Sequence, residues 1–263
     1  MKNREHGLTV VELLIVMVVT GLLTGLIFTF TFSYWRQGVV TQTELNAIVE
    51  RLNASDYLRE NISSSTGLVI QNSIPDDNTL AVDPADPTGK YWKIVHAYRG
   101  LIENNSGVKP VIYFKRYSTD SAQNILFDDL LPYEDDYIVY MDAPTKQLRV
   151  RVLANPSAPG NVTRTSCPPE SATPTCPSDR ILATDVTGVD MRYFTKAGLD
   201  ITYSETEVTD TSVVPAVTYT EYGPDYPVVE VVELTLKLSK VPAHEADDAL
   251  KSSTIIRVAL RNS

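Results

Sequence analysis

The chain has 263 residues, of which 43% are hydrophobic, and a formal net charge of −10 from 33 acidic against 23 basic residues. This length and hydrophobic fraction predict a globular part with its own core. No run of Lys and Arg is present on which a phosphate backbone could lie. The composition therefore argues against direct binding of nucleic acid.

The first element in chain order is a long apolar segment. From Leu8 to Phe32, 25 residues contain a single ionisable side chain, Glu12. As a helix rising about 1.5 Å per residue, the segment is long enough to cross a hydrocarbon core of about 30 Å. A basic head precedes it, and Tyr34–Arg36 form an aromatic and cationic belt after it. These flanks predict a cytoplasmic N-terminus, with everything beyond Trp35 in the periplasm or the exterior.

Two ordinary explanations of this segment fit it poorly. A secretory signal peptide has an apolar region of only about 7 to 15 residues, followed by a small-x-small cleavage site. A plain single-pass anchor does not explain a carboxylate close to the start of the span. Burying such an acid in lipid costs on the order of a few kcal/mol, less if the side chain reaches the head groups. Glu12 therefore predicts a partner inside the membrane.

The sequence GLTVVELLIV, from Gly7 to Val16, resembles the processing junction of type IV prepilins and pseudopilins. The resemblance implies that a prepilin peptidase cuts between Gly7 and Leu8 and methylates the new amine of Leu8. It also implies assembly with other pilins or pseudopilins into a heterologous helical filament, at an inner-membrane assembly platform. In that filament the Leu8 amine of one subunit is expected to pair with Glu12 of a neighbour. Leu8 stands where Phe is usual, and Thr29 where many major pilins carry Pro.

Helical spacing predicts that the same helix continues beyond the membrane. Gly21 and Gly25 form a small-xxx-small pattern, so we expect them to allow close helix packing. Further on, apolar residues predict a stripe that a sheet covers: Leu45, Ile48, Val49, Leu52 and Ile62. The polar stretch from Ser63 to Gly67 predicts the end of the helix. The expected parts are a cleaved leader at 1–7, a membrane part at 8–35, an amphipathic continuation at 36–62 and a β-rich exterior head at 63–263.

Short alternating runs predict the strands of an antiparallel sheet in the head. The expected strands are Trp92–Tyr98, Val111–Tyr117, Tyr137–Met141, Gln147–Val152, Val186–Phe194, Leu199–Tyr203 and two late strands with Val232–Leu238 and Ile256–Leu260. Turns at 142–146 and 195–198 predict two hairpins. The fold class is α+β, a long N-terminal helix packed on an antiparallel sheet, which is the fold that the resemblance to pilins implies. The late strands and the Arg-Asn ending further resemble large minor pilins of the W type and J-type pseudopilins.

The two cysteines lie in a Pro-rich stretch and outside any zinc-binding pattern. Cys167 and Cys176 therefore predict a small disulfide loop, which needs an oxidising compartment. The acidic stretch from Asn72 to Lys90 predicts a solvated loop, with calcium binding as a less favoured alternative. The pair Asp135–Asp136 is expected in a solvated turn.

No catalytic site, metal site or cofactor is expected, because the sequence contains no HExxH, GxSxG or Walker A motif. The sequence therefore predicts a non-enzymatic minor pilin, anchored in the inner membrane by one span and then incorporated in a type IV pilus. A pseudopilin of a type II secretion or DNA-uptake system stays open as an alternative. So does a non-polymerising single-pass adhesin or sensor.

Overall fold

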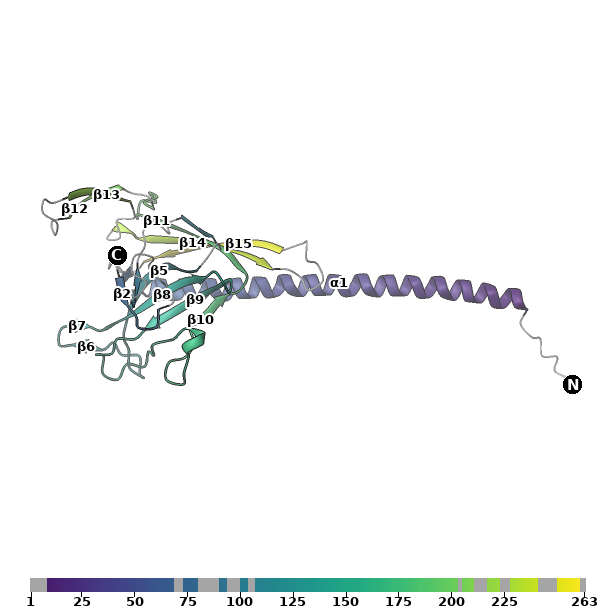
Figure 1. The fold of residues 1–263 in the computed structure, drawn as a ribbon, viewed down its shortest axis with the longest axis horizontal. Helices are drawn as coiled ribbons and strands as arrows, with labels where there is room; N and C mark the ends of the chain where they lie inside the picture. The colour runs from purple at the N-terminus through teal and green to yellow at the C-terminus, as the bar shows by residue number, and fades with distance from the viewer. Residues whose placement is uncertain are drawn as a thin grey trace. The chain divides into compact units, whose positions relative to one another are not determined.

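The structure is a computed structural model that describes residues 9–68, 73–79, 90–93, 100–103, 107–202, 205–210, 217–222, 228–240 and 250–260. The chain divides into two compact units, residues 1–46 with 241–249 and residues 47–240 with 250–263. Figure 1 shows one long helix, α1 (Val10–Ser63), followed by strands. The strands are β1 (Gly67–Leu68), β2 (Ser73–Pro75), β3 (Tyr91–Lys93), β4 (Gly100–Glu103), β5 (Val108–Tyr117), β6 (Phe127–Asp128), β7 (Leu131–Pro132), β8 (Glu134–Asp142), β9 (Gln147–Leu153), β10 (Arg180–Ala183), β11 (Val186–Phe194), β12 (Glu205–Asp210), β13 (Val217–Tyr222), β14 (Val231–Lys240) and β15 (Leu250–Ala259).

The strands of the head form two main sheets. One has the order β1-β5-β8-β9-β10 and the other the order β15-β14-β11-β4, and β12–β13, β2–β3 and β6–β7 form two-stranded pairs. The strands pair antiparallel in both main sheets. The predicted α+β fold, a long N-terminal helix packed against antiparallel sheet, is confirmed. The strands are shared between two sheets, where the sequence predicted one.

One of the two predicted hairpins is confirmed, and the other forms only next to its turn. Strands β8 and β9 pair as predicted, with Asp142 opposite Gln147 across the turn. By contrast, the predicted strand Leu199–Tyr203, of which Tyr203 lies outside the described residues, meets only the end of β11. Its contacts there are an isolated antiparallel bridge from Phe194 to Asp200 and a hydrogen bond from the Ile201 amide to the Tyr193 carbonyl at 2.9 Å. The reason is competition for the edges of β11. Strand β14 pairs along one edge of β11 and β4 occupies part of the other, so that only the end of β11 remains.

Helix α1 packs on the head through a face that the sequence did not predict. Ala54, Leu58 and Ile62 are at most 1% exposed and belong to the main hydrophobic core. Of the predicted stripe only Ile62 is buried, because Leu45, Ile48, Val49 and Leu52 are 41–56% exposed. From Leu52 to Ala54 the helix turns by about 200° around its axis, so the two side chains point in nearly opposite directions. The prediction of a sheet-covered stripe was therefore wrong for four of its five residues.

The five-stranded sheet has a hydrophobic cluster on each face. The main core lies between this sheet, α1 and the four-stranded sheet, and includes Leu148 and Val150 of β9. A smaller cluster on the other face contains Ile74, Trp92, Tyr113, Ile138 and Tyr140. Side chains alternate along a strand, so Arg149 and Arg151 point toward the second face. They are nevertheless buried, at 6% and 0% exposed.

Candidate functional site

The N-terminal end of α1 is closed by a reciprocal cap between Thr9 and Glu12. The backbone amide and the hydroxyl of Thr9 both donate hydrogen bonds to Glu12 Oε2, at 2.9 Å each. In return the amide of Glu12 donates to Thr9 Oγ1 at 3.3 Å. This is a capping box, in which a Thr and a Glu three residues later satisfy donors that the first helical turn leaves free. The spacing of Thr9 and Glu12 is the sequence signal for this cap, which was not among the predicted features.

The remaining predicted assembly residues lie in different parts of the chain. Gly7 and Leu8, the predicted cleavage and methylation sites, are outside the described residues. Gly21 and Gly25 lie in α1, and apart from the adjacent helix backbone no described atom would come within 4 Å of a Cβ added at either glycine. Both glycines therefore leave an open notch on the helix surface, and close packing against another helix stays a prediction.

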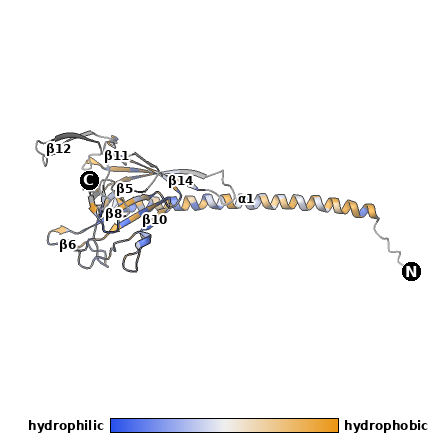
Figure 2. Cartoon of the chain, in the orientation of Figure 1, coloured by the Kyte–Doolittle hydropathy of each residue, from blue (hydrophilic) through white to orange (hydrophobic). Residues whose placement is uncertain are grey.

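The first half of α1 is apolar and long enough to span a membrane. Among the described residues, α1 is the one helix long and apolar enough to cross a membrane, and its most apolar window is not buried by the rest of the chain. Figure 2 shows this part of the helix mainly in the colour of hydrophobic residues. Three threonine hydroxyls in this segment have backbone partners. Thr24, Thr29 and Thr31 each donate to the carbonyl four residues earlier, at 2.8 Å. These bonds lower the cost of placing hydroxyl groups in hydrocarbon.

Polar contacts fix the later part of α1 to the head. Glu50 forms an ion pair with Lys240 at the end of β14 and accepts a hydrogen bond from the amide of Thr184. Near the end of the helix, the Arg180 guanidinium lies 4.4 Å from the centre of the Tyr57 ring. Burial raises the pKa of the Tyr57 phenol, so the ring faces Arg180 in its neutral form. These contacts hold the buried face of α1 on the sheets, and so determine which face of the helix stays exposed.

A buried ion-pair network lies on the outer face of the five-stranded sheet. Arg151 contacts Asp76 through two hydrogen bonds, Nε to Oδ2 at 2.9 Å and Nη2 to Oδ1 at 2.7 Å. Its Nη1 lies 3.4 Å from Asp179 Oδ1. The Trp92 indole also donates to Asp76 and the Tyr140 hydroxyl to Asp179, each at 2.7 Å. The network therefore ties the loop after β2 and the segment before β10 to the centre of the sheet.

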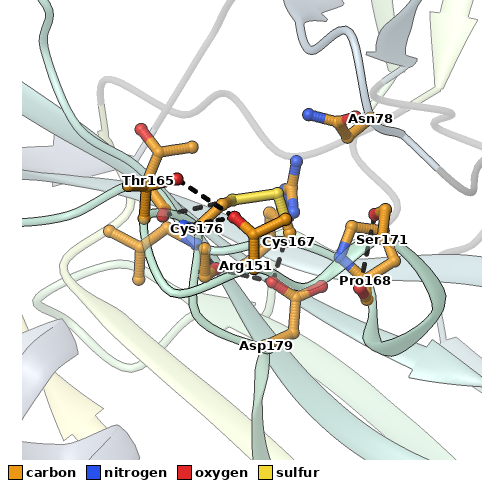
Figure 3. Close-up of a disulfide and its surroundings, with 12 residues drawn as sticks. Asn78, Arg151, Thr165, Cys167, Pro168, Ser171, Cys176 and Asp179 are labelled. Carbon is orange, nitrogen blue, oxygen red and sulfur yellow. Dashed lines mark hydrogen bonds and ion pairs between the residues drawn. A yellow bond between two sulfur atoms is a disulfide. The ribbon is translucent and has the colours of Figure 1, made fainter.

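The disulfide lies directly beside this network. Cys167 and Cys176 are bonded, with their Cα atoms 5.5 Å apart, which confirms the predicted disulfide. Figure 3 shows Arg151 and Asp179 next to the bonded cysteines. The amide of Asp179 donates to the carbonyl of Cys167 at 2.7 Å, and Ser166 Oγ donates to Asp179 Oδ1. The disulfide loop thus covers a buried carboxylate and is not an isolated surface feature.

Two acidic residues that were predicted to be solvated are buried. Asp76 is 6% exposed and forms the ion pair with Arg151, while Asp83 and Asp86 lie outside the described residues. Asp135 lies in β8 and is fully buried, so the predicted turn at Asp135–Asp136 is wrong. Its Oδ1 accepts hydrogen bonds from Ser118 Oγ, the Asn155 amide and Asn161 Nδ2, at 2.8 Å each. Residues from other segments, Ser118, Asn155 and Asn161, therefore meet at this carboxylate. The residues next to Asp135 in the sequence do not indicate these partners.

Within the described ranges, no group of three or more His, Cys, Asp or Glu side chains is arranged to hold a metal ion. The buried carboxylates of Asp76, Asp135 and Asp179 instead accept hydrogen bonds from Arg, Trp, Tyr, Ser and Asn side chains. The chemistry of these groups is that of structural contacts.

Residues 2–28 match the family model described as the prokaryotic N-terminal methylation motif. The N-terminus is of the type IV prepilin kind. The match supports a type IV pilin- or pseudopilin-type protein, a class that is structural and not enzymatic. It implies processing by a prepilin peptidase and assembly with pilins or pseudopilins, and together with the apolar helix it fits a single-pass inner-membrane protein. Comparisons with curated proteins and with solved structures return no match.

Proposed function

We propose that this chain is a minor pilin that enters or primes a type IV filament through α1. In this proposal residues 1–7 are the cleaved leader and residues 8–35 span the membrane. Residues 36–62 continue the helix outside the membrane, and residues 63–263 form the exterior head. The N-terminus is cytoplasmic, and the head lies in an oxidising compartment, where the disulfide persists. The observation that carries the proposal is an apolar stripe of α1 that the head leaves uncovered.

The stripe consists of Ile48, Val49 and Leu52, with Leu45 one turn earlier. Its members are 41–56% exposed, whereas Ala54 and Leu58 on the other side of the helix are at most 1% exposed. Leu52 follows Trp35 by about five helical turns, so lipid at the level of Trp35 does not cover it. A non-polymerising anchor gains nothing from such a stripe in water. A filament subunit buries it against the helices of its neighbours, where it contributes to assembly.

Glu12 supports the same proposal. Both hydrogen bonds from Thr9 reach Oε2, and within the described residues no donor reaches Oε1. Hydrogen bonds from a neutral residue leave the negative charge of the carboxylate uncompensated. After leader removal, the cationic amine of Leu8 on another subunit supplies that compensation, and opposite charges at about 4 Å attract by several kcal/mol at an effective dielectric near 20. The pairing also sets the register between subunits, because each subunit offers one amine and one carboxylate.

The role of a minor subunit rests on the head. A chain of 263 residues is larger than typical major pilins, and its late strands and Arg-Asn ending resemble W-type minor pilins and J-type pseudopilins. A pseudopilin uses the same helix in the same way. Loss of the gene distinguishes the two roles, since a minor pilin is required for surface pili and a pseudopilin for secretion or DNA uptake.

The first test is the mature N-terminus. Mass spectrometry of the full-length protein extracted from membranes is expected to show a chain that begins at Leu8 with a methylated amine. A chain that still carries residues 1–7 in cells with an active prepilin peptidase contradicts the proposal and favours the single-pass adhesin or sensor.

The second test is the substitution Glu12→Gln, with Glu44→Gln as the matched control in an exposed part of the same helix. We expect Glu12→Gln to insert in the membrane normally but to fall at least about tenfold in sheared filaments, because the charge pair is lost. Glu44→Gln is expected to enter filaments like the wild type. Equal incorporation of both variants rejects the charge pair.

A further inference from the structure

The head carries an exposed apolar hairpin, here called the tip hairpin, which consists of β6, β7 and the turn Asp129–Leu130 between them. Its side chains Phe127, Leu130 and Leu131 are 57%, 89% and 73% exposed. Figure 1 shows the tip hairpin, labelled β6 and β7, projecting from the head. Large apolar side chains grouped in this way on a soluble surface mark an interaction site more often than single exposed ones do.

Folding of the head does not require these side chains to be apolar. A tight turn favours Gly, Asn or Asp, and Asp129 adopts the left-handed conformation there, with φ 50°. Leu130 beside it is the most exposed large apolar residue of the described head. A leucine at this position contributes little to the core, so its side chain is available for a contact outside the chain.

The root of the tip hairpin is rigidly held. The amide of Ser118 donates to the carbonyl of Tyr133 at 2.8 Å, and the amide of Tyr133 to the carbonyl of Leu126 at 2.9 Å. The hydroxyl of Ser118 donates to Oδ1 of the buried Asp135, which also binds the segment of Asn155 and Asn161. A fixed root presents the apolar tip in one conformation, which lowers the entropy lost on binding.

The charge around the tip selects the partner. Residues 117–133 contain three aspartates and no Lys, Arg or His, and Asp128 and Asp129 are exposed beside the apolar side chains. Two copies of the tip would bring these carboxylates together, and an anionic membrane would repel them. The complementary surface has apolar groups at its centre and cations at its rim, as in protein interfaces with a desolvated core.

We propose that the tip hairpin is a docking element for a protein partner that offers an apolar pocket bordered by Lys or Arg side chains. Leu130 and Leu131 enter the pocket, and Asp128 and Asp129 face the basic rim. The contact is separate from the helix contacts of a filament, so it persists whether or not α1 polymerises.

The proposal is tested by photo-crosslinking in cells that make the full-length chain. A photoreactive phenylalanine analogue is placed at Leu130, and at Leu199 as the control, an apolar head residue that is 65% exposed. The expected result is an adduct specific to position 130 with one protein, whose crosslinked peptide maps to an apolar pocket with Lys or Arg at its border. The adduct is expected to fall about tenfold with Asp128→Lys and to stay unchanged with Glu170→Lys, the same charge change at another exposed site.

Reversal of the contacting Lys or Arg of the partner to Asp is expected to restore the adduct with Asp128→Lys. Four outcomes overturn the proposal: no adduct at position 130, an adduct with lipid, an adduct with a second copy of this chain, or an adduct that Asp128→Lys does not weaken. Near-UV circular dichroism of the Leu130 and Asp128 variants controls for folding, which neither exposed position is expected to disturb.

Discussion

In α1, Val49 and Leu52 are 55% and 54% exposed although they are apolar, whereas in the head Arg151 is fully buried although it is charged. The helix leaves these apolar side chains exposed because no described part of the head packs over them. The head takes a charge out of water because Asp76 and Asp179 reach it from other segments. Charged groups of the head therefore find their partners within the chain, while the apolar stripe of α1 stays exposed, and under the proposed function other subunits cover it.

The largest expected effect comes from removing the buried cation. Arg151→Ala leaves two buried carboxylates without their ion-pair partner, and we expect it to destabilise the head by about 3 to 5 kcal/mol. Urea unfolding of the full-length protein in detergent, followed by near-UV circular dichroism, measures this change. Arg192→Ala, at an arginine whose side chain is 53% exposed, is the control and is expected to cost less than about 1 kcal/mol. A similar cost for both variants would mean that the buried network contributes little.

A matched pair of leucine substitutions distinguishes the roles of the two faces of α1. Leu58→Ala removes a side chain that is 0% exposed in the main core, and is expected to cost about 2 to 4 kcal/mol of stability. Leu52→Ala is expected to leave the unfolding midpoint nearly unchanged but to reduce recovery in sheared filaments. If Leu52→Ala destabilises the monomer as much as Leu58→Ala, the exposed stripe is part of the head's own core.

The disulfide contributes a smaller amount. Replacing Cys167 and Cys176 together with Ser opens a loop whose ends are nine positions apart, and is expected to cost about 2 to 3 kcal/mol by the chain-entropy model. Reducing agent should lower the unfolding midpoint of the wild type to that of the double variant. It should leave the midpoint of the double variant unchanged. A wild-type midpoint that does not respond to reduction would show that the loop stays in place over Asp179 without the bond.

The smallest expected effect is a dependence on pH. Burial raises the pKa of Asp136 above its ordinary value of 3.8, although Lys115 nearby opposes the shift. The folded chain therefore holds this proton more tightly than the unfolded chain, so its contribution to stability falls as the pH rises from about 3.8 through the raised pKa. Asp136→Asn removes the ionisable group and therefore this decrease in stability with rising pH. The variant is expected to stabilise the head by less than about 1 kcal/mol at pH 7. Unfolding midpoints at pH 4 and pH 7 measure it, and a variant with the pH dependence of the wild type would assign the effect to another group.

Sequence reasoning succeeded where information is local. The apolar run with Glu12, the β8–β9 hairpin and the alternation of β14 are each encoded by residues that are neighbours in the chain. It failed where two segments compete or meet. The segment 199–203 was predicted as a strand along β11, but it meets only the end of β11, because β14 and β4 occupy the rest of its two edges.

The residues proposed for assembly also differ in how far local sequence predicts them. Glu12 was identified from its position in an apolar segment, and its cap with Thr9 could have been found from the spacing of the two residues. The choice between the two faces of α1 could not be made from the spacing, because both faces carry apolar residues. Only the structure shows that the face with Ala47, Ala54 and Leu58 is the buried one.

By itself, the sequence determined the prepilin-type N-terminus, the membrane-spanning helix and the α+β class, because each depends on patterns within a short stretch of chain. Only the tertiary structure decided that Asp76, Asp135 and Arg151 are buried, which face of α1 stays uncovered and that an apolar hairpin projects from the head. The physical reason is that burial and charge pairing depend on groups far apart in the sequence, such as Arg151 and Asp76, which are brought together only when the sheets form.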